Sequence, residues 1–249
     1  MDREADVSGI LSETVDVIGR AGRAVLIYVL VLGLCSGIGG LFGLVSMDDG
    51  LFSARWIGGG FDTRTSGLFQ FLFGLGNSLL FVVASYFLLV QMMRAIGRYM
   101  GAGARFWSFV GMSILAAIGV GIGFVLLLIP GIILMVRWSA ANGYLLSGEH
   151  SITDSLGASW EATKGHGWSI FGAGLLLSIG LVVLNSAIMG VVLGTGIATG
   201  GGLFSPMFAL GVTLSSFVES FGNAVNFAFS MAVFHLVAPA DTSVADVFE

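Results

Sequence analysis

The stretch Val125–Trp138 reads VLLLIPGIILMVRW and decides the fold class of this chain. It is apolar throughout except for a proline-glycine pair, Pro130 and Gly131, and one arginine, Arg137. A charge near the middle of a membrane-spanning helix costs about 2.5–3.5 kcal/mol on insertion scales, so it normally meets a partner, lines a polar cavity or reaches the interface. The stretch therefore predicts a membrane segment with one polar feature that needs an explanation.

The composition of the whole chain supports a membrane location. Of the 249 residues, 56% are hydrophobic and only 10% are charged, which is outside the range of ordinary soluble domains. The net charge of −5 and the lack of a basic stripe argue against a nucleic-acid partner. A single cysteine, Cys35, excludes an intramolecular disulfide and a thiolate metal cluster. We expect an all-α, polytopic transmembrane helical bundle surrounded by membrane lipids.

Six apolar segments make up most of the chain. They are residues 24–45, 68–93, 107–129, 131–147, 168–193 and 207–237. A helix needs roughly 20 residues to cross a hydrocarbon core of about 30 Å, and the fourth segment is the short one. It either spans the membrane or forms a broken, re-entrant pair with the third segment. We expect one membrane domain over residues 1–238 with about six spans, and an acidic mobile tail over residues 239–249.

The positions of arginine and lysine predict the orientation, because cytoplasmic loops carry an excess of both. With the N-terminus inside, only Arg55 and Arg64 lie outside the cell. The cytoplasmic set is Arg3, Arg20, Arg23, Arg94, Arg98, Arg105 and Lys164. We therefore expect a multi-pass protein of the bacterial inner (cytoplasmic) membrane with both termini in the cytoplasm.

Two short amphipathic segments precede spans on the cytoplasmic side. Residues 7–22 place apolar side chains on one helical stripe and Glu13 and Asp16 elsewhere. Residues 151–164 begin with the capping-box spacing of Ser151 and Asp154, and Gly165 supplies a stop. Both segments are expected to be cytoplasmic interfacial helices.

Glycines four residues apart predict close contacts between helices. Gly33 and Gly37 form one such pair, and Gly119 and Gly123 form another. Small residues let helix backbones approach in lipid, where no hydrophobic force drives helices together.

A row of polar residues marks the last span. They recur at steps of four, four, three and four, which places them on one helical face: Ser215, Glu219, Asn223, Asn226 and Ser230. Polar groups are costly in hydrocarbon, so this seam is expected to face the bundle interior. There it would meet Asn185 of the fifth span and Asn77 or Gln70 of the second.

Two interpretations of Arg137 follow. In the first, Arg137 and Glu219 form an ion pair, with Asn223 as a bridge, because two separate unpaired charges would be more costly. In the second, Arg137 extends to an interface while Glu219 is protonated against another span. The seam is accordingly either internal polar glue or a passage for a substrate.

The sequence contains no recognisable catalytic or cofactor motif. The three histidines, His150, His166 and His235, lack the spacing of metal ligands. The glycine-rich runs do not follow strands and carry no phosphate-binding ending, and no Gly-x-Ser-x-Gly elbow occurs. We therefore expect no catalytic residues, no cofactor and no metal.

The order of residues from Ile129 to Phe171 resembles a known family. The residues that carry the resemblance are Pro130, Gly131, Arg137, Glu149, Ser159, Trp160 and Gly165. The segment is similar to an uncharacterised bacterial integral membrane family related to the membrane domain of glycerophosphoryl diester phosphodiesterases. The resemblance implies an inner-membrane helical bundle, found alone or fused to a phosphodiesterase domain. It departs after Arg137, where Trp-Ser-Ala-Ala-Asn-Gly replaces a proline-containing stretch.

Two functions are compatible with these features. The first is a non-enzymatic membrane protein that acts as a scaffold or accessory in lipid or envelope processes. The alternative is a small transporter or channel-like protein that uses the polar seam. Phosphodiesterase activity is not expected, since the chain has no soluble segment long enough for a barrel domain. The expected partners are membrane lipids and either another membrane protein or further copies of this chain.

Overall fold

The computed structural model describes residues 5–41, 68–98, 105–148, 150–198 and 206–238. These residues form α1 (Val7–Arg20), α2 (Gly22–Leu41), α3 (Leu68–Ala95), α4 (Phe106–Leu126), α5 (Leu128–Arg137), α6 (Ala141–Leu146), α7 (Ile152–Ala162), α8 (Gly167–Ala198) and α9 (Pro206–Val237). The predicted class, an all-α polytopic bundle, is confirmed. The predicted acidic tail, Arg3, Arg55 and Arg64 lie outside the described residues.

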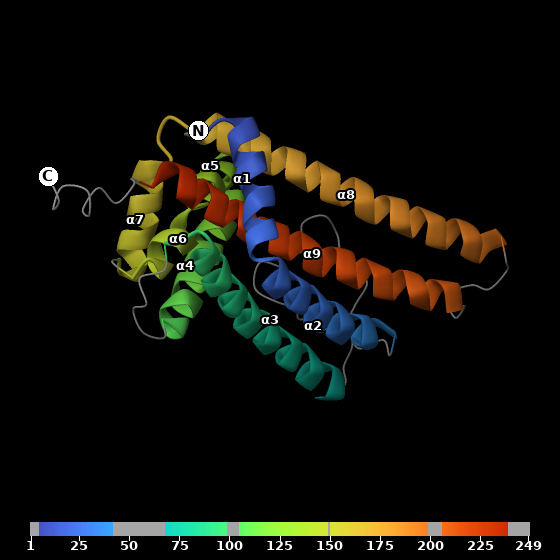
Figure 1. Ribbon diagram of the computed structural model, residues 1–249. Helices are drawn as coiled ribbons and strands as arrows, with labels where there is room; N and C mark the ends of the chain where they lie inside the picture. The colour runs from blue at the N-terminus through green and yellow to red at the C-terminus, as the bar shows by residue number, and fades with distance from the viewer. Residues whose placement is uncertain (1–4, 42–67, 99–104, 149, 199–205, 239–249) are drawn as a thin grey trace, which may run out of the picture.

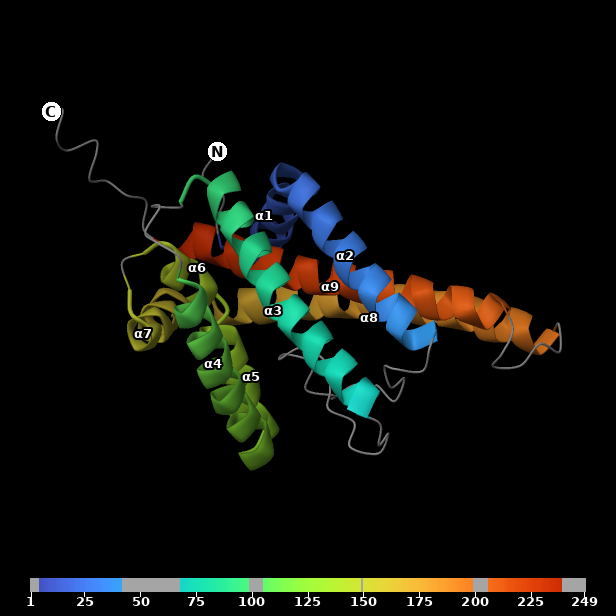
Figure 2. The ribbon, with the colours of Figure 1, turned by 90° about the horizontal axis from the view of Figure 1, so that it is seen from below.

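Helix α9 is the centre of the bundle. It packs against α1, α2, α3, α6 and α8, and α8 runs beside it over much of its length (Figure 1). The α4–α5 hairpin projects away from the α8–α9 pair when the molecule is seen from below (Figure 2). Among the described residues, five helices are long and apolar enough to cross a membrane: α2, α3, α4, α8 and α9.

One end of the bundle gathers the short helices, and we call α1, α6 and α7 together the platform (Figure 1). Two arginines at neighbouring helix ends make hydrogen bonds at this end of the bundle. Arg98, just after α3, donates to the carbonyl of Ala238 just after α9 at 3.4 Å. Arg105, just before α4, donates to the carbonyl of Leu145 in α6 at 3.1 Å and to that of His150 at 2.6 Å. The platform therefore closes one end of the bundle.

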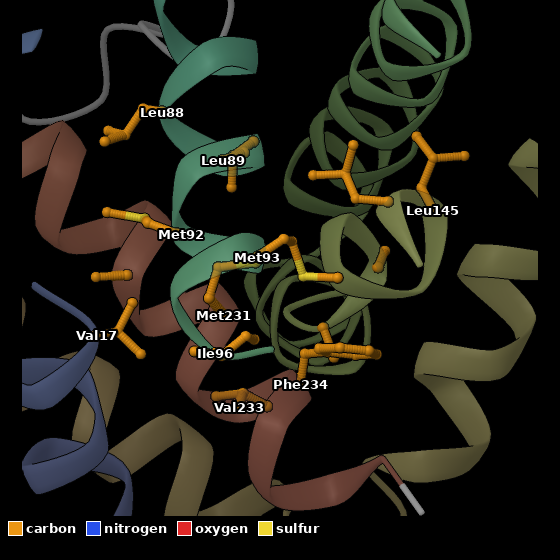
Figure 3. Packing of buried hydrophobic residues seen from close by; sticks show 14 of the residues in the cluster. Val17, Leu88, Leu89, Met92, Met93, Ile96, Leu145, Met231, Val233 and Phe234 are labelled. Carbon is orange, nitrogen blue, oxygen red and sulfur yellow. The ribbon is translucent and has the colours of Figure 1, made fainter. Parts of the chain in front are cut away.

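The tightest apolar packing also lies at the platform end. Leu89, Met92 and Met93 from α3 meet Met231 from α9 and Leu145 from α6, and all five are fully buried (Figure 3). By contrast, none of the most apolar window of α8 is buried inside the protein. In a bilayer, lipid solvates such a surface, so protein packing is concentrated at the platform and lipid contact elsewhere.

The predicted glycine contacts are confirmed. A Cβ atom on Gly33 of α2 would lie 2.5 Å from the ring of Phe217 in α9, and one on Gly37 would lie 3.3 Å from Thr213. In the α4–α5 hairpin, a Cβ atom on Gly123 would lie 2.9 Å from the Cα atom of Gly131. Both helix pairs are close because these positions carry no side chain.

The two predicted lead-in helices form α1 and α7. The N-cap of α7 is Ser151, whose hydroxyl accepts from the Asp154 amide at 3.3 Å, and Gly165 has a φ of +86° after the helix. These two predictions are confirmed. In α1 the amphipathic stripe is present, but Glu13 belongs to its buried face rather than its polar face. That part of the prediction is wrong.

The fourth predicted span, residues 131–147, is not one helix. Its residues lie in α5, which has 10 residues, and α6, which has 6. A 10-residue helix is about 15 Å long, half the thickness of the hydrocarbon core. Instead, α5 packs antiparallel along α4, and the chain returns through α6 to the platform from which α4 began. The structure therefore has a hairpin of two helices around Pro130 and Gly131 and a second break between α5 and α6, and whether residues 131–147 span the membrane stays a prediction.

Candidate functional site

The turn between α4 and α5 is built by the proline-glycine pair. Leu127 is extended, with φ −162° and ψ 144°, and ends α4. Pro130 then falls in the first turn of α5, where the missing amide N–H needs no helical partner. A Cβ atom on Gly131 would lie 2.6 Å from the ring of Phe124. The pair thus directs the chain back along α4 at van der Waals distance.

The break between α5 and α6 is the main irregularity of the chain inside the bundle. The Ser159 hydroxyl of α7 donates to the carbonyl of Arg137 at 2.7 Å and accepts from the amide of Ala140 at 3.2 Å. Both Ser159 and Thr163, which also reaches the Arg137 carbonyl at 3.4 Å, are fully buried. An unsatisfied buried backbone group costs about 1–3 kcal/mol, so α7 stabilises the break directly.

A second serine holds the break from α9. Ser230 donates to the carbonyl of Ser139 at 2.6 Å and accepts from the side-chain amide of Asn142 at 3.4 Å. We call Ser159, Thr163 and Ser230 the clamp. Non-helical backbone is tolerated at membrane depth only where its polar groups are satisfied by protein or water. The clamp supplies those partners from α7 and α9.

The Arg137 guanidinium lies over an aromatic ring. Its Cζ atom is 5.5 Å from the centroid of the Trp160 ring on α7, within the range of a cation–π contact. The Nη1 atom is buried and has no hydrogen-bond partner in the described part of the chain. The residue as a whole is partly buried.

The ion pair between Arg137 and Glu219 is not formed, and the positions of the helices explain why. The break next to Arg137 is level with Ser230, through the bond to Ser139. Glu219 lies eleven residues earlier in α9, which is about 16 Å along the helix. Moreover, α5 packs against α4, α7 and α8. The predicted pair is therefore absent, and the second interpretation, with Arg137 at an interface and Glu219 protonated, stays a prediction.

The polar residues of α9 do not form one continuous interior seam. Ser230 is buried in the clamp and Ser215 is partly buried, as are Glu219 and Asn223, but Asn226 is exposed. Asn185 of α8 is exposed as well. The reason is the contact between α8 and α9, which runs through other positions, such as Leu181 against Gly222. The prediction that Asn226 and Asn185 face the interior is therefore wrong.

The inner part of the seam meets α2 and α3. The hydroxyls of Tyr28 and Ser85 are 3.3 Å apart and buried, and Glu219 is close enough to act electrostatically on Tyr28. The rings of Phe81 and Phe227 are 6.5 Å apart. Asn77 lies one turn before Phe81, and its buried Oδ1 atom has no partner among the described residues. The side chain of Gln70 is not among those that the structure describes.

Sequence reasoning missed a charged cluster on the platform. The Oε1 atom of Glu13 in α1 is 3.0 Å from His235 Nδ1 in α9 and 3.7 Å from Arg20 Nη1, and the Glu13 side chain is only 4% exposed. The burial of Glu13 could have been predicted from the sequence. Glu13 is three residues after Ile10 and four before Val17, so it shares their buried helical face. The cluster ties α1 to the end of α9.

The residues of the family resemblance form one local unit. Pro130 and Gly131 build the hairpin turn, while Ser159 and Trp160 receive the backbone and the side chain of Arg137. Gly165 ends the segment after α7, and Glu149 lies outside the described residues. No group of three or more His, Cys, Asp or Glu side chains suited to a metal occurs in the part of the chain that the structure describes.

Comparisons with protein-family models, characterised proteins and solved structures find no match to this chain. The resemblance to the phosphodiesterase-related membrane family therefore stays a prediction that rests on the motif residues alone.

Proposed function

We propose that this chain is a non-enzymatic integral protein of the bacterial inner membrane that acts as a scaffold or accessory in lipid or envelope processes. In this proposal the platform faces the cytoplasm and both termini are on that side. The described lysine and arginines other than Arg137 support the orientation, since they all lie at or next to the platform end: Arg20, Arg23, Arg94, Arg98, Arg105 and Lys164.

The observation that carries the proposal is the use of buried polar groups as structural ties. Ser159 and Ser230 bind backbone groups of the break, and Ser216 and Ser220 donate to carbonyls of their own helix. Groups committed in this way are not available to a moving solute. Internal hydrogen bonds of this kind hold the platform in a fixed position, as a scaffold requires.

The transporter alternative has less support. It depends on one seam that joins Arg137, Glu219, Asn226 and Asn185, whereas these residues lie in different environments. Arg137 contacts Trp160, and both asparagines are on the exposed face of the α8–α9 pair. The remaining polar group around Tyr28 is the best position at which a transport function could be tested.

The outward faces of the platform are suited to a soluble or peripheral partner. Helix α1 exposes Ser8 and Ser12, and α7 exposes Thr153, Gly157 and Glu161. A docked partner would therefore meet a polar, mixed surface held by the Glu13 cluster and the clamp.

Site-specific photocrosslinking in the host bacterium tests the proposal. A photoreactive residue at Ser12 or Gly157 on the platform should give discrete protein adducts, whereas one at Ile179 on the exposed face of α8 should give lipid adducts or none. Platform positions that yield no protein adduct, together with solute uptake by proteoliposomes of the purified protein, would favour the transporter instead.

A further inference from the structure

Asn226 is an exposed polar residue near the middle of a long apolar helix. It belongs to the span Leu210–Val237 of α9 and lies eleven residues before Val237, which is about 16 Å along the helix. A hydrocarbon core is about 30 Å thick, so a residue at this position in a spanning helix is roughly halfway across it. In the part of the chain that the structure describes, the Asn226 side chain makes no hydrogen bond.

The packing of α8 against α9 leaves Asn226 uncovered. The two helices run antiparallel and side by side (Figure 1). Cβ atoms added to two glycines would lie 3.4 and 3.5 Å from the facing helix, which gives two contact pairs: Gly174 with Phe229, and Gly222 with Leu181. Ser178 of α8 is midway between these pairs and therefore level with Asn226, and both residues are exposed. The small serine leaves room for a further helix to approach α9 at this level.

An amide side chain at this depth needs a hydrogen-bond partner. Polar groups without partners are costly in hydrocarbon, and asparagine is too short to reach the interface as lysine or arginine does. In membrane helices such groups bond to another helix, and small residues allow the close approach. The amide is both donor and acceptor, so two identical amides related by a two-fold axis satisfy each other. A second copy of this chain is therefore a self-complementary partner.

We propose that α9 packs against α9 of a second copy at Asn226, and that the two Asn226 amides hydrogen-bond across a two-fold axis. Both copies have the same orientation in the bilayer, so the axis runs along the membrane normal and the two platforms lie on the same side. The inference goes beyond the proposed function and does not depend on it. It is tested on purified protein, so its failure would leave the crosslinking test of the platform unaffected.

Asn185 of α8 provides a matched control. It is also exposed, but it lies eighteen residues after Gly167, the first residue of α8, which is about 27 Å from the platform end. At that level a spanning helix is close to the far boundary of the hydrocarbon core, where water and headgroups hydrogen-bond an amide. Replacement of Asn185 by leucine should therefore leave the association of two copies unchanged.

Sedimentation equilibrium of the full-length protein in density-matched detergent micelles measures the association. The wild type should dimerise, and Asn226→Leu should raise the dimer dissociation constant about tenfold, as expected for the loss of hydrogen bonds between membrane helices. Asn226→Gln keeps the donor and the acceptor and should stay within about threefold of the wild type. Asn185→Leu should change the constant by less than about twofold. Because Asn226 is exposed, its replacement by leucine should leave the fold intact.

Disulfide formation locates the contact without removing a stabilising group. In a Cys35→Ser background, Asn226→Cys should crosslink two copies under mild oxidation, because a disulfide forms only where the Cα atoms are within about 7 Å. Asn185→Cys should not crosslink.

The proposal fails if the wild type is monomeric at every concentration measured, which would assign Asn226 to water or lipid. It also fails if Asn226→Leu dimerises as tightly as the wild type, or if Asn226→Leu and Asn185→Leu weaken the dimer equally. Crosslinking through Asn185→Cys but not through Asn226→Cys would place the contact on α8 instead.

Discussion

The α5–α6 segment and helix α8 are both strongly apolar, yet their backbone hydrogen bonds are satisfied in opposite ways. Helix α8 continues for 32 residues and satisfies its backbone internally, so it needs little from its neighbours. The α5–α6 segment leaves helical geometry after Arg137, and the clamp residues Ser159 and Ser230 complete its backbone bonds. The difference shows that Ser159 and Ser230 are positioned where an interrupted helix leaves backbone groups without helical partners.

The largest expected effect comes from closing the space beside the break. A Cβ atom on Gly143 of α6 would lie 2.1 Å from the ring of Phe234 in α9, whereas one on Gly180 of α8 would meet nothing within 4 Å. Gly143→Leu should lower the free energy of unfolding by about 3 kcal/mol, the upper range of overpacking. Gly180→Leu should change it by less than about 0.5 kcal/mol. Unfolding in mixed micelles measures both, and equal effects would contradict the comparison.

Removal of the clamp residue Ser159, which lies in α7, is expected to have the next largest effect. Ser159→Ala deletes two hydrogen bonds to the break and should cost about 2 kcal/mol, because a carbonyl and an amide lose a buried partner. Ser178→Ala in α8 is the control, since Ser178 is exposed and binds only the carbonyl of Gly174 in its own helix. It should be neutral within about 0.5 kcal/mol. The same unfolding assay applies, and a Ser159→Ala protein as stable as Ser178→Ala would show that the clamp is not needed.

Loss of the clamp residue Ser230, which lies in α9, should lower the free energy of unfolding by a smaller amount. Ser230→Ala removes the bond to the Ser139 carbonyl and leaves the Asn142 amide without its acceptor, and we expect a cost of about 1 kcal/mol. Ser216→Ala, on the same helix, removes only a bond to the helix's own Val212 carbonyl. A double-mutant cycle with Ser159→Ala measures whether the two clamp residues act together. Independent, additive effects would mean that each serine holds the backbone separately.

The smallest effect is expected on α8 itself. Asn185 is exposed on a helix whose surface is lipid-facing, so Asn185→Leu should leave the free energy of unfolding unchanged within about 0.5 kcal/mol. Blue-native electrophoresis of the same variant reports its oligomeric state. A clear loss of stability or a change of oligomeric state would instead identify a partner helix for Asn185, and α8 would no longer be a helix that lipid alone solvates.

The same comparison explains what sequence reasoning could and could not predict. The apolar helices, the Ser151 cap and the close approach of Gly33 and Gly123 follow from local chemistry, and they were predicted. The break after Arg137 was not, because hydropathy averages over residues 131–147 and carries no information on partners elsewhere in the chain. Ser159 and Ser230 are those partners, and they lie in other helices.

For the candidate site, the sequence indicated which residues to consider but not which neighbours they contact. The motif residues from Pro130 to Trp160 lie close together around the α4–α5 hairpin and α7, and Arg137 lies among them. Helical periodicity places Glu219 and Asn226 on one face of α9, but it does not state which neighbour covers that face. Glu13 was assigned to a polar face, although its spacing to Ile10 and Val17 put it on the buried one.

Hydrogen exchange at Ala140 tests the central claim, that buried polar side chains hold the broken backbone, most directly. The Ala140 amide donates to Ser159 at 3.2 Å in a buried position. In the wild-type protein, peptides that contain it should exchange slowly, and Ser159→Ala should accelerate them about tenfold or more, as expected for the loss of one buried bond. Peptides from α8 should be unchanged. Equal exchange at Ala140 in the wild type and in Ser159→Ala would contradict the account.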